Sequence, residues 1–500
     1  MALPFSLVLY GLAIWAELRG ALTLTGGEFV YPLDDTYIHM SLARTLALHG
    51  VWGITPQEFS GSSSSPLWTL ILAGLFAAAG ANAYIPLVLN VIAGAALVFV
   101  VDRALSPGLH AAWRLAATSL IVFAMPLPTL VFLAMEHVLH ALITLLFVFA
   151  AAAIYRGETV RGRVAIVAAL AFALVGARYE GLFVVIPVCF LVWARHGLRP
   201  ALVIGAAGIV PVVGYGFFAL SQGGFFVPNG LLVKAVAPLL GHPPPEGFHS
   251  RSPVLPLWFL IALSAVLLFD RTDRRARFLH LSFLPAAGLH LGLAATGHLF
   301  RYEGYLIPLG VVAIATQVAV FGFHPRFYTN ASRLARTLFW ALIVAPFLIR
   351  GGMAALITPR ACANIHGQQV RMARLVHARL DEGAVALNDI GAVAWFGAVP
   401  ILDLAGLGSD DVARLRIQGR FGPEAIRPLI REHGVRLAML YDSWFRGALP
   451  PEWTRIGEWM TPDNVVLGDA RVSFYAVDPA AAERLKRAID DFGGAESGGD

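Results

Sequence analysis

The sequence predicts a polytopic α-helical membrane protein with a C-terminal α/β domain, and three observations lead to this prediction. Of the 500 residues, 57% are hydrophobic and only 14% are charged, whereas a soluble protein carries about 25% charged residues. The apolar residues fall into runs of roughly 17 to 22, the length that crosses the hydrocarbon core of a membrane as a helix. After about Gly352 the composition changes to patterns typical of a soluble domain.

Twelve apolar runs are expected to span the membrane, so the fold class has about 12–13 spans. The N-terminus lacks the basic start of a cleaved signal peptide, and we expect its apolar run to be retained as the first helix. The expected spans cover residues 3–24, 66–81, 83–103, 115–134, 138–155, 163–177, 181–195, 200–220, 254–270, 278–296, 303–322 and 335–355.

The distribution of arginine predicts which ends of these helices face the cytoplasm. Arginines gather in the short loops 156–163, 195–199 and 271–277, and cytoplasmic loops carry an excess of Lys and Arg. With these loops inside, the C-terminal domain lies on the extracytoplasmic side of the inner (plasma) membrane. A cytoplasmic N-terminus then requires an odd number of spans, whereas twelve are counted. We expect the miscount between residues 104 and 139, where two prolines could split one run into two short helices.

The chain is expected to have two domains. Residues 1–355 form the membrane domain, which contains a polar external loop at 25–65. Residues 356–492 form the extracytoplasmic α/β domain, because short strand-like runs alternate there with helical stretches. The strand-like runs are 384–387, 401–404, 437–440 and 472–477. Residues 493–500 are expected to be a disordered tail.

The strongest local feature is a pair of aspartates, Asp34 and Asp35, a few residues beyond the first span. Adjacent carboxylates repel each other, which raises one pKa and couples their titration. Apolar residues recur every four positions after the pair and predict an amphipathic helix along the membrane interface. Neighbouring side chains at a helix start point in different directions. One aspartate could therefore face a site while the other caps the helix, and capping alone explains the pair equally well.

Other polar and aromatic side chains recur beside the pair and at predicted external helix ends. Ionisable groups against a membrane span are functional candidates. Cations there could bind a phosphate, and carboxylates could act as a base or hold a metal. For each charged group alone, an ion pair or snorkelling to the interface is the better explanation, and for any single serine a flexible turn is an equally good one. The candidates are Tyr37, His39, Ser65, Trp68, Glu136, His137, Arg178, Glu180, Lys234, His298, Arg301 and Tyr302.

Several function classes are excluded or unsupported. The sequence contains no Walker-type loop, no dinucleotide fingerprint, no His-Glu-x-x-His and no Cys-x-x-Cys, so a nucleotide-sugar donor is unsupported. The net charge of +5 follows from the arginine-rich loops of a membrane protein and does not indicate nucleic-acid binding.

These motifs resemble those of the GT-C glycosyltransferases, and within that group the mycobacterial terminal arabinofuranosyltransferase family and its bacterial relatives. Asp34-Asp35-Thr36-Tyr37-Ile38 is similar to their Asp-Asp-x-Tyr-Ile, and Ser64-Ser65-Pro66-Leu67-Trp68 to their Thr-Ser-Pro-Leu-Trp. Residues 134–137 and 178–181 are similar to Gly-Met-Glu-Thr and Arg-Pro-Glu-Gly, although His137 replaces the threonine and Tyr179 the proline. In the C-terminal domain, residues 388–391 and 403–407 are likewise similar.

The resemblance implies a GT-C-like fold, a polyprenyl-phosphate sugar donor that enters from the lipid, and a glycan, lipid or protein acceptor in the cell envelope. Asp34 or Asp35, with Asp34 preferred, would act as general base on the acceptor hydroxyl, which attacks the anomeric carbon with inversion. Lys234 and Arg301, together with Arg178, would hold the donor phosphate. The resemblance also allows a divalent cation, Mg²⁺, Mn²⁺ or Ca²⁺, on the aspartate pair.

Two alternatives come from other functional classes. A transporter or flippase for lipid-linked saccharides predicts polar residues near mid-span and matching halves. Here the polar groups lie at helix ends, and no halves match. A sensor whose external domain binds a ligand would leave the aspartate pair without a purpose. The transferase is therefore the preferred prediction.

Overall fold

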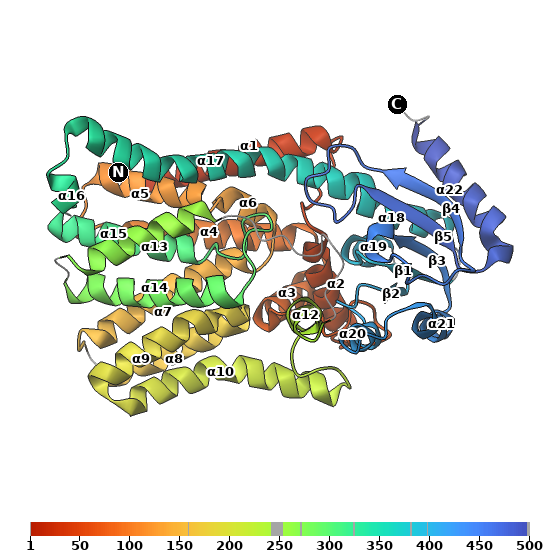
Figure 1. Cartoon of the computed structure of the whole chain (residues 1–500), viewed down its shortest axis with the longest axis horizontal. Helices are drawn as coiled ribbons and strands as arrows, with labels where there is room; N and C mark the ends of the chain where they lie inside the picture. Colours follow the sequence, from red (N-terminus) through yellow and green to blue (C-terminus); the bar gives the residue numbers. More distant parts are fainter. Residues whose placement is uncertain are drawn as a thin grey trace.

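The computed structural model describes residues 2–158, 160–241, 254–270, 273–323, 326–380, 383–397 and 399–497. Helices form an elongated bundle, and a five-stranded sheet lies at one end of it (Figure 1). The fold is therefore the predicted helical membrane domain with a C-terminal α/β domain.

In the described part of the chain, six helices are long and apolar enough to cross a membrane, judged by length and composition. They are α1 (Ala2–Leu24), α4 (Tyr84–Leu105), α7 (His137–Tyr155), α9 (Leu182–His196) with the turn before it, α10 (Leu198–Ser221), and α17 (Arg333–Ile365) continued by η3 (His366–Val370) and α18 (Arg371–Arg379). Shorter helices complete the bundle: α5 (Ala111–Ala124), α6 (Leu127–Phe132), α8 (Val160–Ala177), α13 (Leu255–Leu268), α14 (Arg274–Leu293) and α15 (Leu306–Phe321).

The outer surface of the bundle is apolar. Phe5 of α1, Ile92 of α4, Trp193 of α9, Phe217 of α10 and Leu342 of α17 are all exposed. So many large exposed apolar side chains are unusual in a soluble protein, whereas lipid favours them. The loops between α7 and α8, α9 and α10, and α13 and α14 lie at the end of the bundle farthest from the sheet (Figure 1). Residues 271 and 272 of the last of these loops lie outside the described residues. The assignment of this end to the cytoplasm stays a prediction.

The segment expected to form the second span does not cross the bundle. Helix α3 (Pro66–Ala79) follows a loop that contacts the C-terminal domain, since Gly61 N lies 3.4 Å from Asp410 Oδ1. After α3 the chain is still at that end, because Tyr31 Oη donates a hydrogen bond to Ala83 O. Both ends of α3 therefore lie at the same end of the bundle, next to the C-terminal domain.

This difference resolves the parity of the spans. Removing 66–81 from the twelve expected spans leaves eleven, the odd number that the expected sidedness requires. The break between residues 104 and 139 exists, because α5 ends at Ala124 and α6 begins at Leu127 after Pro126. However, α6 has only six residues and cannot cross a membrane by itself. The miscount therefore lies in α3 and not in the proline segment.

Helix α2 (Asp34–His49) forms where the periodicity predicted a helix, but it does not lie on a lipid surface. It packs between α3 and α19 (Gly391–Gly397), at the junction of the bundle and the C-terminal domain (Figure 1). Ile38 belongs to the core of the sheet domain, and Leu42 packs with Trp52 and Tyr215. Its apolar positions therefore face protein. A protein surface selects apolar residues at the same helical period as a membrane surface does.

The sheet has the order β2-β1-β3-β5-β4. The strands are β1 (Ala384–Leu387), β2 (Ile401–Asp403), β3 (Val435–Leu440), β4 (Thr454–Met460) and β5 (Arg471–Ala476). β2, β1 and β3 are parallel, with Val385 opposite both Ile401 and Leu437, whereas β5 runs antiparallel to β3 and β4. Alternate residues of β1 belong to two different apolar clusters, one on each face of the sheet. Because both of its faces are buried, the sequence of β1 is a continuous apolar run.

Helices cover the sheet and end the chain. α20 (Asp410–Ile417) and α21 (Pro423–Glu432) pack on one face, and α22 (Ala482–Ser497) contacts β4 and β5. α22 continues through residue 497, into the segment expected to be a disordered tail, and residues 498–500 lie outside the described residues. The carboxyl ends of β1, β2 and β3 lead into loops that face the bundle, which is where an open parallel sheet usually binds ligands.

Candidate active site

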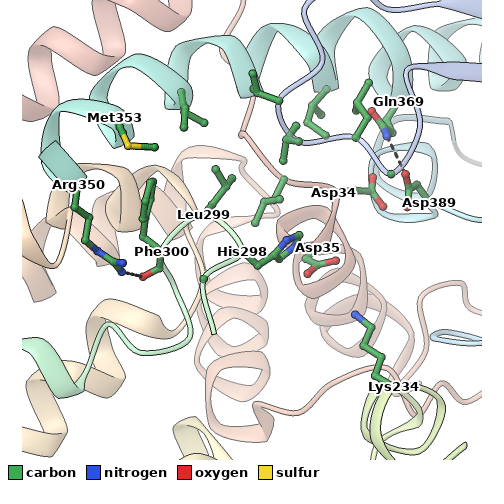
Figure 2. Close-up of a pocket in the computed structure, with 18 of the residues that line it drawn as sticks. Asp34, Asp35, Lys234, His298, Leu299, Phe300, Arg350, Met353, Gln369 and Asp389 are labelled. Atoms are coloured by element: carbon green, nitrogen blue, oxygen red, sulfur yellow. Dashed lines mark hydrogen bonds between the residues drawn. The ribbon is translucent and has the colours of Figure 1, made fainter. Parts of the chain in front are cut away.

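A cavity of about 810 Å³ lies where the helical bundle meets the sheet domain. Asp34 and Asp35 of α2 form part of its wall, together with Lys234 and His298 (Figure 2). The sheet domain contributes Asp389 after β1, Leu407 after β2 and Trp444 after β3. Two parts of the chain that are far apart in the sequence thus build one site.

Asp34 is fixed by the sheet domain. Its Oδ2 accepts a hydrogen bond from Gly391 N at 2.7 Å, and its Oδ1 accepts one from Ala392 N at 2.8 Å. These amides begin α19, so Asp34 does cap a helix, but not its own: the N-cap of α2 is Leu33, which makes no side-chain cap. Burial and the neighbouring Asp389 carboxylate raise the pKa of Asp34 to about 8.

Asp35 points away from Asp34, toward cations. Its Oδ2 lies 2.6 Å from Arg301 Nη2, and its side chain is 32% exposed. Desolvation raises the pKa of Asp35, but the positive charges of Arg301, Lys234 and His298 outweigh it, so the net pKa lies below the usual value for aspartate. The two neighbouring carboxyl groups are therefore in opposite electrostatic environments.

The cations come from three segments that meet at the cavity. Lys234 lies in η2 (Leu232–Val236), and His298 lies in the turn before α15. His298, Leu299 and Phe300 have φ values of 46°, 54° and 64°, a conformation that costs non-glycine residues about 1–3 kcal/mol each. Arg350 of α17 holds this turn from behind, because it donates to Phe300 O at 3.2 Å and pairs with Glu303.

A second group of charged residues lies behind this wall and does not line the cavity. Arg178 donates to Glu136 Oε1 and to Glu180 Oε1, both at 2.6 Å. His39 and His137 lie 3.8 Å from Glu136. The Tyr302 ring contacts both guanidinium groups, at 5.7 Å from Arg178 and 5.0 Å from Arg301. This cluster supports Arg301 from within the protein.

The remaining sequence candidates are buried packing residues. Tyr37 Oη accepts a hydrogen bond from Tyr31 N at 2.9 Å. Ser65 N donates to Ser63 Oγ at 3.1 Å, and Trp68 is 2% exposed in an apolar cluster. Of the expected site residues, the structure therefore brings together Asp34, Asp35, Lys234 and His298 at the cavity, with Arg301 in contact through Asp35.

Sequence reasoning missed four polar lining residues, Arg350, Gln369, Asp389 and Trp444. Asp389 Oδ2 accepts hydrogen bonds from Tyr441 Oη at 2.6 Å and from Gln369 Nε2 at 3.0 Å. Arg350 lies inside an expected span, and an ionisable residue there is a signal that could have found it. The only sequence signal at Asp389 is the resemblance of residues 388–391 to the GT-C relatives, and nothing in the sequence brings Asp389 near Asp34.

The aspartate pair does not fit the expected cation site. Asp34 is directed to the α19 amides and Asp35 to Arg301, so the two carboxylates do not converge on one point. Within the described ranges, no three His, Cys, Asp or Glu side chains form a group that could hold a metal ion.

The other side of the cavity is apolar. α13 contributes Leu255 and Pro256, and α17 contributes Pro346, Ile349 and Met353. Ile349 and Met353 remain accessible, by 60% and 49%. The cavity thus joins a charged centre to an apolar wall formed by α13 and α17.

Comparisons with known proteins agree with this architecture. A family model described as a domain of unknown function (DUF8728) matches residues 363–475, which contain most of the sheet domain. No curated protein sequence matches the chain. Among solved structures, ArnT from Cupriavidus metallidurans bound to undecaprenyl phosphate has a TM-score of 0.53 at 12% identity and covers 95% of this chain and 98% of its own.

Two structures of an Archaeoglobus fulgidus oligosaccharyltransferase are less similar. The apo form has a TM-score of 0.48 at 12% identity over 87% of this chain and 69% of its own. The complex with zinc and sulfate has a TM-score of 0.47 at 11% identity over 94% and 73%. At such identities the likeness to ArnT establishes the fold of the chain and leaves its activity to be argued from the site.

Proposed function

Because the chain has the GT-C fold, we propose that it is an integral membrane glycosyltransferase that moves a sugar from a polyprenyl-phosphate-linked donor to an acceptor in the cell envelope. One observation carries this proposal: a single cavity joins carboxylates, cations and an apolar wall formed by α13 and α17. Only a ligand with an anionic head, polar groups and a long apolar tail matches all three surfaces. ArnT, whose fold is shared, was crystallised with undecaprenyl phosphate.

The donor would bind with its phosphate beside Lys234, His298 and Arg301. Charge-assisted hydrogen bonds from cations are the strongest that phosphates make in proteins. The same cations offset the negative charge that develops on the leaving phosphate as its bond to the anomeric carbon breaks. The prenyl chain would leave the cavity between α13 and α17, where Ile349 and Met353 line the wall.

Asp34 is the better candidate for the general base. In the proposed reaction Asp34 takes the proton of an acceptor hydroxyl, whose oxygen attacks the anomeric carbon opposite the leaving phosphate and so inverts its configuration. Proton-transfer efficiency follows the proton affinity of the base. The pKa of Asp34 is raised to about 8, whereas the pKa of Asp35 is lowered by its cations. Asp35 would instead hold Arg301 in position for the phosphate.

The direct test is sugar transfer by the purified full-length chain in lipid nanodiscs, with a panel of polyprenyl-phosphate sugars and an envelope extract as acceptor source. We expect release of polyprenyl phosphate together with a glycosylated product. Movement of the intact donor across the bilayer without transfer would contradict the proposal and would favour the flippase alternative.

Lys234→Met is expected to raise the donor KM about tenfold, because a hydrogen bond to a charged group contributes roughly 1.5–3 kcal/mol and 1.4 kcal/mol is a factor of ten. The measurement is initial rate against donor concentration. Lys486 on α22 is exposed and is the other lysine of the chain, so Lys486→Met is the matched control. Equal donor KM values for the two variants would remove Lys234 from the phosphate site.

Ile349→Trp is expected to hinder the prenyl chain. The larger ring fills the apolar wall, and overpacking costs about 1–3 kcal/mol, so the KM of a long-chain donor should rise roughly tenfold. A short-chain donor analogue should be affected much less. Leu342→Trp, on the exposed surface of the same helix and outside the cavity, is the control. If both variants treat long and short donors alike, the lipid path lies elsewhere.

A further inference from the structure

The sheet domain brings a second carboxylate against Asp34. Asp389 follows β1 and lines the same cavity, and its side chain lies beside that of Asp34 (Figure 2). The two residues come from different domains and are 355 positions apart in the sequence. Their proximity exists only because the sheet domain is seated on α2.

Neutral donors fix both carboxyl groups. Asp34 accepts hydrogen bonds from two backbone amides, at 2.7 and 2.8 Å. Asp389 accepts hydrogen bonds from Tyr441 Oη at 2.6 Å and from Gln369 Nε2 at 3.0 Å. These contacts hold the two side chains in place, so neither can turn away from the other without losing hydrogen bonds.

The pair differs from the other carboxylates in and behind the site. Asp35 pairs with Arg301, Glu136 with Arg178, and Glu303 with Arg350. By contrast, no ion pair between described residues includes Asp34 or Asp389. Two carboxylates that face each other without a cation cannot both be ionised at low cost, and one of them keeps a proton.

We infer that Asp389 is a positioning residue of the transfer reaction, which shares one proton with Asp34 and so prepares Asp34 to take the proton of the acceptor hydroxyl. This inference rests on the proposed function. The shared proton must leave before the reaction, and the acceptor proton then moves to Asp34 as the new glycosidic bond forms and the phosphate departs with the bonding electrons. The matched domain of unknown function would thus complete the base.

Other titratable groups surround the pair and belong in the interpretation of any pH profile. Some of them lie on the same helix as Asp34 or beyond β3, whereas the cations lie on the far side of Asp35. They are Asp35, Tyr37, Tyr441, Asp469, Arg301, Lys234 and His298. Because the pKa of Tyr441 is raised well above its usual value, it stays neutral where the carboxyl pair loses its proton.

The first test is the pH dependence of kcat/KM for transfer. The base acts only when deprotonated, so the rate should rise with pH through about 8, the pKa of Asp34. Asp389→Asn keeps an oxygen for Tyr441 but removes the negative charge, and it should move this limb down by about one pH unit or more. Asp389→Glu should restore it. A limb that stays in place in Asp389→Asn would overturn the inference.

The second test needs no activity and so separates this inference from the proposed function. Infrared difference spectra between low and high pH should contain the carbonyl band of a protonated carboxylic acid that titrates near pH 8, and both Asp389→Asn and Asp34→Asn should shift or remove it. Asp442→Asn is the control, because Asp442 is a sheet-domain carboxylate outside the cavity lining. A band unchanged in Asp389→Asn, or one that Mg²⁺ abolishes and EDTA restores at constant pH, would overturn the shared proton.

Discussion

Replacing Asp34 with asparagine is expected to lower the kcat of sugar transfer by about 10²- to 10⁴-fold, the contribution that a positioned general base usually makes. Asparagine keeps the size of the side chain but cannot accept a proton from the acceptor hydroxyl. Donor affinity should change little, because the cations proposed to hold the phosphate lie on the side of Asp35. The measurement is single-turnover transfer at saturating donor, with donor binding measured separately.

Because Asp34 also holds the start of α19 by hydrogen bonds, the effect of its replacement on protein stability has to be controlled. Asparagine can accept a hydrogen bond from only one of the two α19 amides that contact Asp34, so Asp34→Asn should also lower the thermal stability of the protein. A hydrogen bond to a charged group contributes roughly 1.5–3 kcal/mol, and a folded variant should remain for assay. Asp35→Asn leaves these amides unaffected. If Asp34→Asn turns over normally, or if only Asp35→Asn is inactive, Asp34 is not the base.

Much of this site could be predicted because placing ionisable side chains next to apolar spans costs free energy. An ionisable group close to an apolar span is a functional candidate. This holds for Asp34, Asp35, Lys234, His298 and Arg301. Their common end of the bundle followed from the arginine-rich loops. Their convergence on one cavity did not follow, because it depends on how helices far apart in the sequence pack together.

The part contributed by the sheet domain could not be predicted from sequence. Asp389 is one carboxylate among many in a soluble-like domain, where such residues are common and need no explanation. Its proximity to Asp34 depends on the packing of α19 against α2, and no local sequence pattern predicts that packing. The same holds for α2 itself, since a helical apolar period fits a neighbouring protein surface as well as a membrane.

Helix α3 illustrates the limit of hydropathy. Its apolar residues satisfy a composition test for a span, but composition does not say whether a helix crosses the membrane or stays at one side. The return of the chain to Tyr31 after α3 decides the matter. A parity conflict was the only sign of this error in the sequence, and it pointed to the neighbouring proline segment.

Arg301→Met is the second change with a large expected effect, a loss of about 10²- to 10³-fold in kcat/KM, comparable to the removal of one donor that stabilises a developing anion. Arg301 is 3% exposed and lies 2.6 Å from Asp35. Its removal takes a cation from the proposed phosphate site and leaves the Asp35 charge without its nearest partner. Both effects repel an anionic donor, so the donor KM should rise and kcat should fall.

The double variant Arg301→Met/Asp35→Asn separates these two effects. It removes the pair together, so no uncompensated charge remains, and replacing both members of a buried pair is usually far less destabilising than breaking it. Thermal stability should therefore recover, whereas transfer should stay low because the phosphate still lacks Arg301. Recovery of transfer as well would mean that Arg301 only balances Asp35. In that case Lys234 and His298 would have to hold the donor phosphate without it, and Asp35 would have no role in positioning a phosphate ligand.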